Sequence, residues 1–418
     1  MKLRISGRLE PLANVVGMGA WAGSQLLLMV AIASALSLDV VGVFSLGLTV
    51  FSLLMVALGL NMRLAIAVDR EDRIAVLPAL AIRFVTALGV FAAALATMSV
   101  YAPSSAAFLF GAVLLSGRIS DQLVDIFYGF QQQQGRSLMV SASFFLRGMM
   151  TCLLSVGLFL WRSPPQAFVL AGTVTYCLVS ILFEIALFRG RWRPVAGGRF
   201  LSSVTEVLQD ERIRSVSTFP MFDALHFSSF RLAVAPVLDP RSFGLFALAM
   251  NVFSAVQVAI TALGLTALAR LKSGAYERAG DPVKSMLRDA FVQGAVCVAL
   301  FGLGSLVFAG LGGAKSDDPQ MLDLFLVGNF LALLLFPFTA FIAQGSVFFG
   351  DRAGYWQAPL MGSVAFGLAA ACLAALGHRL QWHSTNAYMM LCGALFVSSL
   401  LRISVSLYRL RTPLPADV

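Results

Sequence analysis

The stretch that decides the fold is DVVGVFSLGLTVFSLLMVALGL, residues 39–60, because a similar phrase returns 200 residues later. The second copy, residues 239–265, reads DPRSFGLFALAMNVFSAVQVAITALGL. In both copies a glycine, Gly42 or Gly244, is followed eight residues later by Val-Phe-Ser, and both copies close on Ala-Leu-Gly-Leu. The second copy closes three residues later, which is close to one turn of a helix, so a helix would keep roughly the same face. The repeat therefore predicts a duplicated helical unit.

The composition makes lipid the solvent for most of the chain. Of its 418 residues, 59% are hydrophobic and 12% are charged, and the mean hydropathy is +0.85, which is more apolar surface than a soluble fold can bury. A bilayer core about 30 Å thick needs about 20 apolar residues per helix. We predict an all-α polytopic membrane protein with about twelve transmembrane helices. The predicted spans are 12–36, 40–62, 77–100, 104–129, 138–160, 166–188, 215–236, 242–268, 287–312, 321–347, 356–377 and 386–408.

The distribution of lysine and arginine predicts the orientation, because cytoplasmic loops hold an excess of these residues. Most of the 30 cations fall in alternate loops and in the two end segments. We therefore expect a multi-pass membrane protein with both termini cytoplasmic; the bacterial cytoplasmic (inner) membrane is the location implied by the family resemblance described below. The first apolar run is longer than the apolar core of a cleaved signal peptide, so it is interpreted as a retained span. The net charge of +9 then reflects topology and contact with anionic lipid headgroups, and no nucleic-acid partner is expected.

The longest polar segment, residues 189–214, divides the predicted spans into two sets of six. We predict an N-terminal six-helix lobe over 1–190, a cytoplasmic linker over 191–213 and a C-terminal six-helix lobe over 214–418. The repeated phrase forms the second span of each lobe and enters the membrane from the same side in both. Transporters built from such parallel repeats bind substrate between their halves. A central cavity between the lobes is therefore predicted.

Metal sites, disulfides and catalytic groups are not expected. The five cysteines are odd in number and fall within predicted spans, without metal-ligand spacing. His378 and His383 share a predicted outer loop that lacks a carboxylate or a cysteine to complete a metal site. The chain also has no glycine-rich phosphate loop of the nucleotide-binding type. We expect a protein without a cofactor, and one that is not an enzyme.

Two segments resemble a known family. The first copy runs from GVFSLG to LGLNMR, ending in Arg63, and IFYGFQQQQGRSLMVSASFFLRG, residues 126–148, joins the fourth and fifth predicted spans. These segments resemble the polysaccharide and O-antigen (Wzx-type) flippases of the multidrug/oligosaccharidyl-lipid/polysaccharide (MOP) exporter superfamily. The resemblance implies two six-helix lobes around a central cavity. It also implies a lipid-linked glycan as cargo, and other polysaccharide-assembly proteins as partners.

Charged residues in the fourth and fifth predicted spans indicate a site, because an ionised group near the bilayer centre needs a partner or a function. Arg118, Asp121 and Asp125 lie on one helical face by their spacing. Arg147 lies at a similar depth in the next span, where it is within reach of Asp121 or Asp125. Two interpretations stay open. The charges form an ion pair that holds the first lobe together, or they line the transport cavity and the two aspartates serve in ion coupling.

The seventh predicted span carries a second charged group in FPMFDALHFSSFRLAV. Asp223 and His226 are one helical turn apart, and Arg231 follows nearer the outer face. Pro220 frees backbone groups close to this cluster, as often happens along a substrate path. Asp223 and His226 are candidates for an H⁺ or Na⁺ site. The alternatives are a helix-contact role for His226 and an Arg231 side chain that extends to the membrane surface.

Arginine suits one class of cargo, since the guanidinium binds phosphate oxygens with forked hydrogen bonds and stays charged. We predict that Arg118, Arg147 and Arg231 bind the diphosphate of a polyprenyl-diphosphate-linked oligosaccharide while its tail stays in the membrane lipid. Weaker polar features are predicted to be interhelical hydrogen-bonding groups, among them Glu184 and Asn329. The run 131–134 is predicted to be a solvated corner.

The leading functional hypothesis is an alternating-access flippase for cell-surface polysaccharide assembly. Ion-coupled multidrug efflux is the first alternative, although it favours carboxylates without nearby cations. A membrane polymerase or ligase of polysaccharide assembly is a second alternative, but the predicted outer loops are too short for a catalytic face. A purely structural membrane protein would not explain charges at mid-depth in both lobes.

Overall fold

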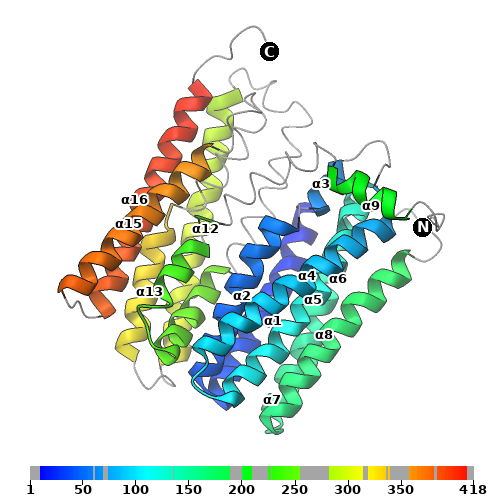
Figure 1. Ribbon diagram of the computed structural model, residues 1–418, viewed down its shortest axis with the longest axis horizontal. Helices are drawn as coiled ribbons and strands as arrows, with labels where there is room; N and C mark the ends of the chain where they lie inside the picture. The colour runs from blue at the N-terminus through cyan, green and yellow to red at the C-terminus, as the bar shows by residue number, and fades with distance from the viewer. Residues whose placement is uncertain are drawn as a thin grey trace. The chain divides into compact units, whose positions relative to one another are not determined.

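The computed structural model describes two compact units, and every regular element in its described residues is a helix (Figure 1). Unit 1 comprises Met1–Ala224 with Pro240–Gly244, and unit 2 comprises Leu225–Asp239 with Leu245–Val418. The described residues are 10–59, 62–68, 74–134, 136–188, 200–209, 225–226, 228–254, 282–313, 319–335, 338, 357–380 and 384–411. The expected all-α membrane fold is confirmed, with seven described helices long and apolar enough to cross a membrane.

Unit 1 contains the first six of these seven helices, as the sequence predicts. The fifth predicted span is a continuous helical run with one π-helical turn, η1. The helices of unit 1 are α1 (Glu10–Ala35), α2 (Leu38–Leu58), α3 (Met62–Val68), α4 (Val76–Tyr101), α5 (Ser105–Gln133), α6 (Ser137–Thr151), η1 (Cys152–Val156), α7 (Gly157–Leu160), α8 (Pro165–Phe188) and α9 (Phe200–Gln209).

Serine caps set where two of these helices begin. The hydroxyl of Ser37 accepts a hydrogen bond from the backbone N–H of Val40 at the start of α2, and Ser104 does the same at the start of α5. Each hydroxyl satisfies a backbone donor that has no partner within the helix. At its other end α2 stops at Leu58, and Gly59 of the repeated Leu-Gly-Leu phrase is the C-cap.

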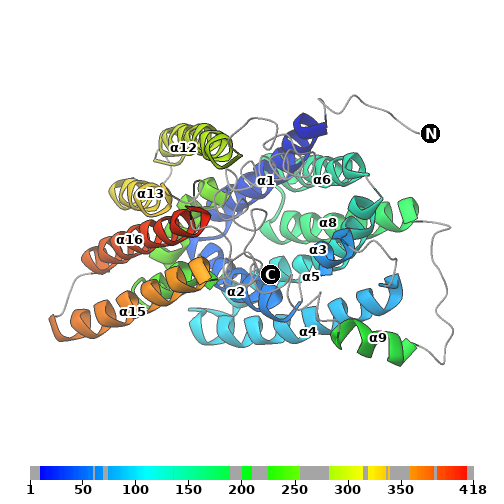
Figure 2. The same ribbon diagram turned by 90° about the horizontal axis from the view of Figure 1, so that it is seen from above.

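Helices α1 and α6 pack side by side, and glycines allow their backbones to approach closely (Figure 2). A Cβ added to Gly148 of α6 would lie 2.7 Å from the carbonyl carbon of Ala20 in α1, and one added to Gly17 of α1 would meet the backbone of Ser141 in α6. Small residues at such contacts are typical of helices that associate in lipid, where tight packing replaces the hydrophobic effect.

The repeated glycine has a packing role in both copies of the phrase. Within unit 1, a Cβ on Gly42 would meet the carbonyl oxygen of Pro240, and a Cβ on Gly244 would meet the carbonyl oxygen of Leu38. Neither position has room for a side chain larger than hydrogen. The two copies thus share this glycine because the backbones of residues 38–42 and 240–244 lie against each other.

The predicted linker contains a helix. Helix α9 lies inside residues 191–213 and packs against α4. Its buried Val207 joins a hydrophobic cluster that includes Ile82 of α4 and Ile126 of α5. The predicted boundaries of the lobes and linker otherwise remain a prediction.

Unit 2 is described over four long helices: α12 (Pro282–Gly313), α13 (Pro319–Leu333), α15 (Gln357–Leu380) and α16 (Ser384–Arg411). Helix α16 packs against α13 and α15, and it contains the seventh long apolar segment, Thr385–Tyr408. The rings of Phe325 and Tyr388 meet edge to face with centroids 4.9 Å apart in its core. The predicted spans 215–236, 242–268 and 321–347 lie partly outside the described residues.

Candidate functional site

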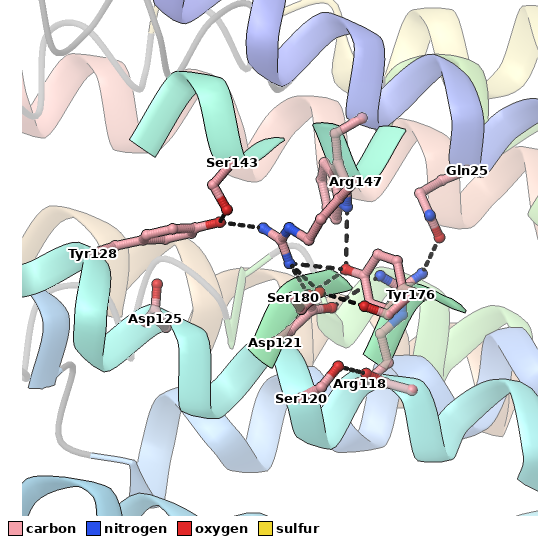
Figure 3. A network of polar contacts seen from close by, with 12 residues as sticks. Gln25, Arg118, Ser120, Asp121, Asp125, Tyr128, Ser143, Arg147, Tyr176 and Ser180 are labelled. Atoms are coloured by element: carbon pink, nitrogen blue, oxygen red, sulfur yellow. Dashed lines mark hydrogen bonds and ion pairs between the residues drawn. The ribbon is translucent and has the colours of Figure 1, made fainter. Parts of the chain in front are cut away.

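Helix α5 carries a polar stripe with about one residue per turn, as its sequence spacing predicts. The stripe consists of Arg118, Asp121, Asp125, Tyr128, Gln131 and Gln132. These side chains contact polar side chains of α1, α3, α4, α6 and α8, so α5 supplies polar partners to the helices that surround it. Figure 3 shows the contacts around Asp121 and Arg147.

Asp121 accepts contacts from three other side chains of the site. Its Oδ1 lies 2.8 Å from Nη1 of Arg147, and its Oδ2 lies 3.2 Å from Nη1 of Arg118. The hydroxyl of Tyr176 in α8 donates a hydrogen bond to the same Oδ1 (Figure 3). The structure thus brings together Arg118, Asp121 and Arg147, and it pairs Arg147 with Asp121, not with Asp125.

The Arg147 guanidinium is enclosed, with only 2% of its surface exposed. Its Nη2 donates to the hydroxyl of Tyr128 over 2.5 Å. Its Cζ lies over the rings of Phe144, Tyr128 and Tyr176, at 4.9, 5.5 and 5.5 Å from their centroids. Cations over aromatic faces are stabilised by the ring electrons. Arg147 is therefore enclosed by its contacts, holds Asp121 and has little room for a ligand.

Arg118 lines a pocket. Its Nη2 donates to Oε1 of Gln25 over 2.7 Å, and 13% of its side chain is exposed. The pocket is small, with a cavity volume of about 20 Å³, and lies among α1, α2, α5, α6 and α8 within unit 1. Thr151 also lines it, and its buried hydroxyl oxygen has no hydrogen-bond partner among the described residues. Arg118 is therefore the cation of the network that is open to a bound anion.

Asp125 belongs to a second network. Its two oxygens lie 3.2 Å from Nη1 of Arg63 and 3.3 Å from Nη2 of Arg83. Arg83 also donates to the carbonyl of Gly59, the C-cap of α2, over 2.7 Å. Arg63 lies in the short helix α3, and Arg83 is buried seven residues into α4.

Glu184 and Gln131 form a third polar contact, which sequence reasoning recognised only in part. Glu184 of α8 is fully buried, and Nε2 of Gln131 donates to its Oε2 over 2.6 Å. The expected interhelical hydrogen bond of Glu184 is confirmed. The predicted solvated corner is wrong at Gln131, which is 3% exposed because α5 continues to Gln133.

The candidates in unit 2 do not form one site among the described residues. Arg231 donates from Nη2 to Oγ of Ser254 over 3.0 Å, and fully buried His226 lies 3.3 Å from Oγ of Ser399. Asp223 and Pro220 lie outside the described residues, so the Asp223–His226 ion site stays a prediction. The hydroxyl of Tyr388 donates to Oδ1 of Asn329 over 3.1 Å, which confirms the interhelical hydrogen bond expected of that asparagine.

Comparison with known proteins gives matches at the level of structure. Neither a family model nor a curated protein matches the sequence. A MOP superfamily transporter from Pyrococcus furiosus superposes with a TM-score of 0.66 at 14% identity, over 96% of this chain and 94% of that chain. The fold is that of MOP transporters. The outward-facing conformation of a multidrug resistance MATE family transporter has a TM-score of 0.65 at 14% identity, over 96% and 94% of the chains.

A third match is the MATE transporter ClbM in complex with Rb⁺, with a TM-score of 0.55 at 16% identity over 97% and 95% of the chains. The MOP fold consists of twelve helices in two lobes, in agreement with the number and grouping of the predicted spans. At these identities the likeness concerns the fold alone.

Proposed function

We propose that this protein is an alternating-access flippase that moves a polyprenyl-diphosphate-linked oligosaccharide across the bacterial cytoplasmic membrane. The observation that carries the proposal is the pocket lined by Arg118 in a unit of MOP fold. A diphosphate headgroup cannot cross lipid unaided, and a forked guanidinium matches its oxygens. The oligosaccharide would be used in cell-surface polysaccharide assembly, together with other proteins of that process.

The charge balance around Asp121 supports an anionic cargo. Two arginines share this one carboxylate, so the three side chains together carry one positive charge. Arg147 is enclosed by aromatic rings and keeps its bond to Asp121. Arg118 is the more exposed of the two arginines, so a phosphate oxygen can compete with Asp121 for its N–H groups. In this proposal Arg118 binds the headgroup, Arg147 positions Asp121, and Arg231 is a candidate contact in the second lobe.

The matched structure from Pyrococcus furiosus fits this proposal. For that protein, the reversed polarity of the binding pocket suggests a different function. MOP folds can therefore carry pockets of different polarity, and a cationic pocket in this chain would suit a different cargo from that of multidrug transporters. The rubidium complex of ClbM supports an ion-coupled cycle, in which H⁺ or Na⁺ is the second partner here.

Ion-coupled multidrug efflux is the second candidate, because several matched structures are multidrug resistance MATE transporters. A cationic substrate would have to bind beside Arg118 and Arg147, which repel it. The same fold is compatible with efflux, so a transport assay with both classes of substrate separates the two functions.

The test is the sidedness of lipid-linked glycan in cells that lack the protein. We expect the glycan to accumulate on the cytoplasmic leaflet and to be restored to the outer leaflet by wild type. Arg118→Ala should fail to restore it although the variant inserts normally. Arg288→Ala removes an exposed arginine of α12 and should restore it fully. Unchanged sidedness in the deletion strain would contradict the flippase, and full rescue by Arg118→Ala would contradict the cationic pocket.

A further inference from the structure

Three carboxylates of unit 1 differ in what neutralises them. Asp121 is paired with Arg118 and Arg147, and Asp125 is paired with two other arginines. Glu184 forms no ion pair with any of the described residues, although it is fully buried. Each aspartate therefore contacts two guanidinium groups. Glu184 contacts none of these guanidinium groups at ion-pair distance.

The surroundings of Glu184 suit a neutral carboxyl group. Its Oε2 accepts a hydrogen bond from Gln131, and the hydroxyl of Ser143 lies within hydrogen-bonding reach of the carboxyl group. Its Oε1 is buried and has no hydrogen-bond partner in the described part of the chain. Burial penalises an ionised carboxylate far more than a protonated one, and Arg147, which influences Glu184 electrostatically, lies beyond ion-pair distance of it. Oε1 is therefore the atom that would hold a proton.

A chain of polar side chains connects Glu184 with the arginine network. Oγ of Ser143 in α6 lies 2.8 Å from the hydroxyl of Tyr128 in α5, which in turn accepts from Arg147. Arg147 and Tyr128 are the charged and titratable groups that influence Glu184 from these two helices. Through this chain a change of charge at Glu184 reaches the guanidinium that holds Asp121.

We propose that Glu184 is a proton-binding residue of unit 1, and that its proton sets the net charge of the arginine network. With Glu184 ionised, the two positive charges of Arg118 and Arg147 cancel the two negative charges of Asp121 and Glu184. With Glu184 protonated, Arg118, Arg147 and Asp121 together carry one positive charge, as an anion in the pocket requires. The proton comes from water and returns to water. The coupling to cargo rests on the proposed function, whereas proton binding by Glu184 stands apart from it.

The first test measures the proton itself. Infrared difference spectra of the full chain in lipid nanodiscs are compared between mildly acidic and mildly alkaline buffer. We expect the carbonyl band of a protonated carboxyl group to respond to pH in wild type, and to be lost in Glu184→Gln. The band should be kept in Glu206→Gln, which makes the same change at an exposed position of α9. Glu184→Asp should keep the band at a shifted frequency.

Two results of this measurement would overturn the proposal. The first is the absence of a pH-dependent carboxyl band from wild type in every buffer. This result contradicts the proposal even where Glu184→Gln does not fold. The second is a band that persists unchanged in Glu184→Gln or is unshifted in Glu184→Asp, because the proton would then reside elsewhere.

The second test measures coupling, as flipping of a fluorescent polyprenyl-diphosphate lipid in proteoliposomes with and without a pH gradient. Wild type and Glu206→Gln should be accelerated by the gradient, and Glu184→Gln should lose this acceleration. A gradient that accelerates Glu184→Gln as strongly as wild type would overturn the coupling. Absence of flipping in wild type contradicts the proposed function, and the infrared band then decides alone whether Glu184 binds a proton.

Discussion

The pairing of Arg147 with Asp121 predicts a large coupling energy between these two side chains. For unit charges 2.8 Å apart and an effective dielectric constant of about 20, the Coulomb attraction is about 6 kcal/mol. The hydroxyls of Tyr128 and Tyr176 remain to hydrogen-bond the guanidinium when the aspartate is removed, so we expect about half of this value. The variants Asp121→Asn and Arg147→Met should thus be coupled by about 3 kcal/mol.

The assay is a double-mutant cycle on the free energy of unfolding in detergent micelles. Asp121→Asn leaves the buried charge of Arg147 without its ion-pair partner and should destabilise the protein by about 3–5 kcal/mol. Arg147→Met leaves Asp121 paired with Arg118 and should destabilise the protein less. The double variant should be much less destabilised than the sum of the two. Asp125→Asn is the matched control, because it makes the same change one helical turn along α5, in a network that does not include Arg147.

The cycle with Asp125→Asn should give a coupling to Arg147→Met below about 0.5 kcal/mol. A coupling of similar size for both aspartates would refute the assignment of separate networks. A coupling near zero for Asp121 would refute the ion pair itself, and with it the role of Arg147 in positioning this carboxylate.

Three further variants test the packing of the units by thermal melting in detergent. Arg83→Met removes a buried hydrogen bond and an ion pair and should destabilise unit 1 by about 2–3 kcal/mol, whereas exposed Arg288→Met should stay within about 0.5 kcal/mol of wild type. Tyr388→Phe removes two hydrogen bonds of one buried hydroxyl and should lower the stability of unit 2 by about 1–2 kcal/mol. Gly148→Ala forces α1 and α6 apart and should cost about 1–3 kcal/mol, while Gly19→Ala, with no atom within 4 Å of the new Cβ, should be neutral or slightly stabilising. Equal melting temperatures for Arg83→Met and Arg288→Met would contradict the contacts of Arg83. Equal melting temperatures for Gly148→Ala and Gly19→Ala would contradict the close approach of α1 and α6. An unchanged melting temperature for Tyr388→Phe would contradict the hydrogen bonds of its hydroxyl.

The sequence predicts unit 1 well because lipid imposes a simple length rule. A helix must be apolar for about 20 residues to cross the bilayer, and that signal survives without any knowledge of packing. The contact between Arg118 and Asp121 also follows from the sequence, since residues three apart share a helical face. The contact with Arg147 follows from the antiparallel arrangement of consecutive spans.

The sequence is less informative about arginines near helix ends. Arg83 lies near one end of the predicted span 77–100, and in the structure it is buried two turns inside α4. Arg402 lies near one end of the predicted span 386–408, and it is 1% exposed in α16. The rule for orientation weighs charge by position along the chain. It does not tell which of these cations turns inward to bind a carboxylate or a backbone carbonyl.

To predict which carboxylate binds a proton, one must know how each helix is rotated about its axis, and the sequence does not specify this rotation. Asp121, Asp125 and Glu184 read alike as acidic residues in apolar helices. In the structure, α5 directs Asp121 and Asp125 toward two arginines each, and α8 directs Glu184 toward an amide. A small rotation of α8 would change that environment entirely, because neighbouring positions face different helices. The described structure therefore gives each aspartate two ion pairs and gives Glu184 none, and this difference in partners is the basis for assigning the proton to Glu184.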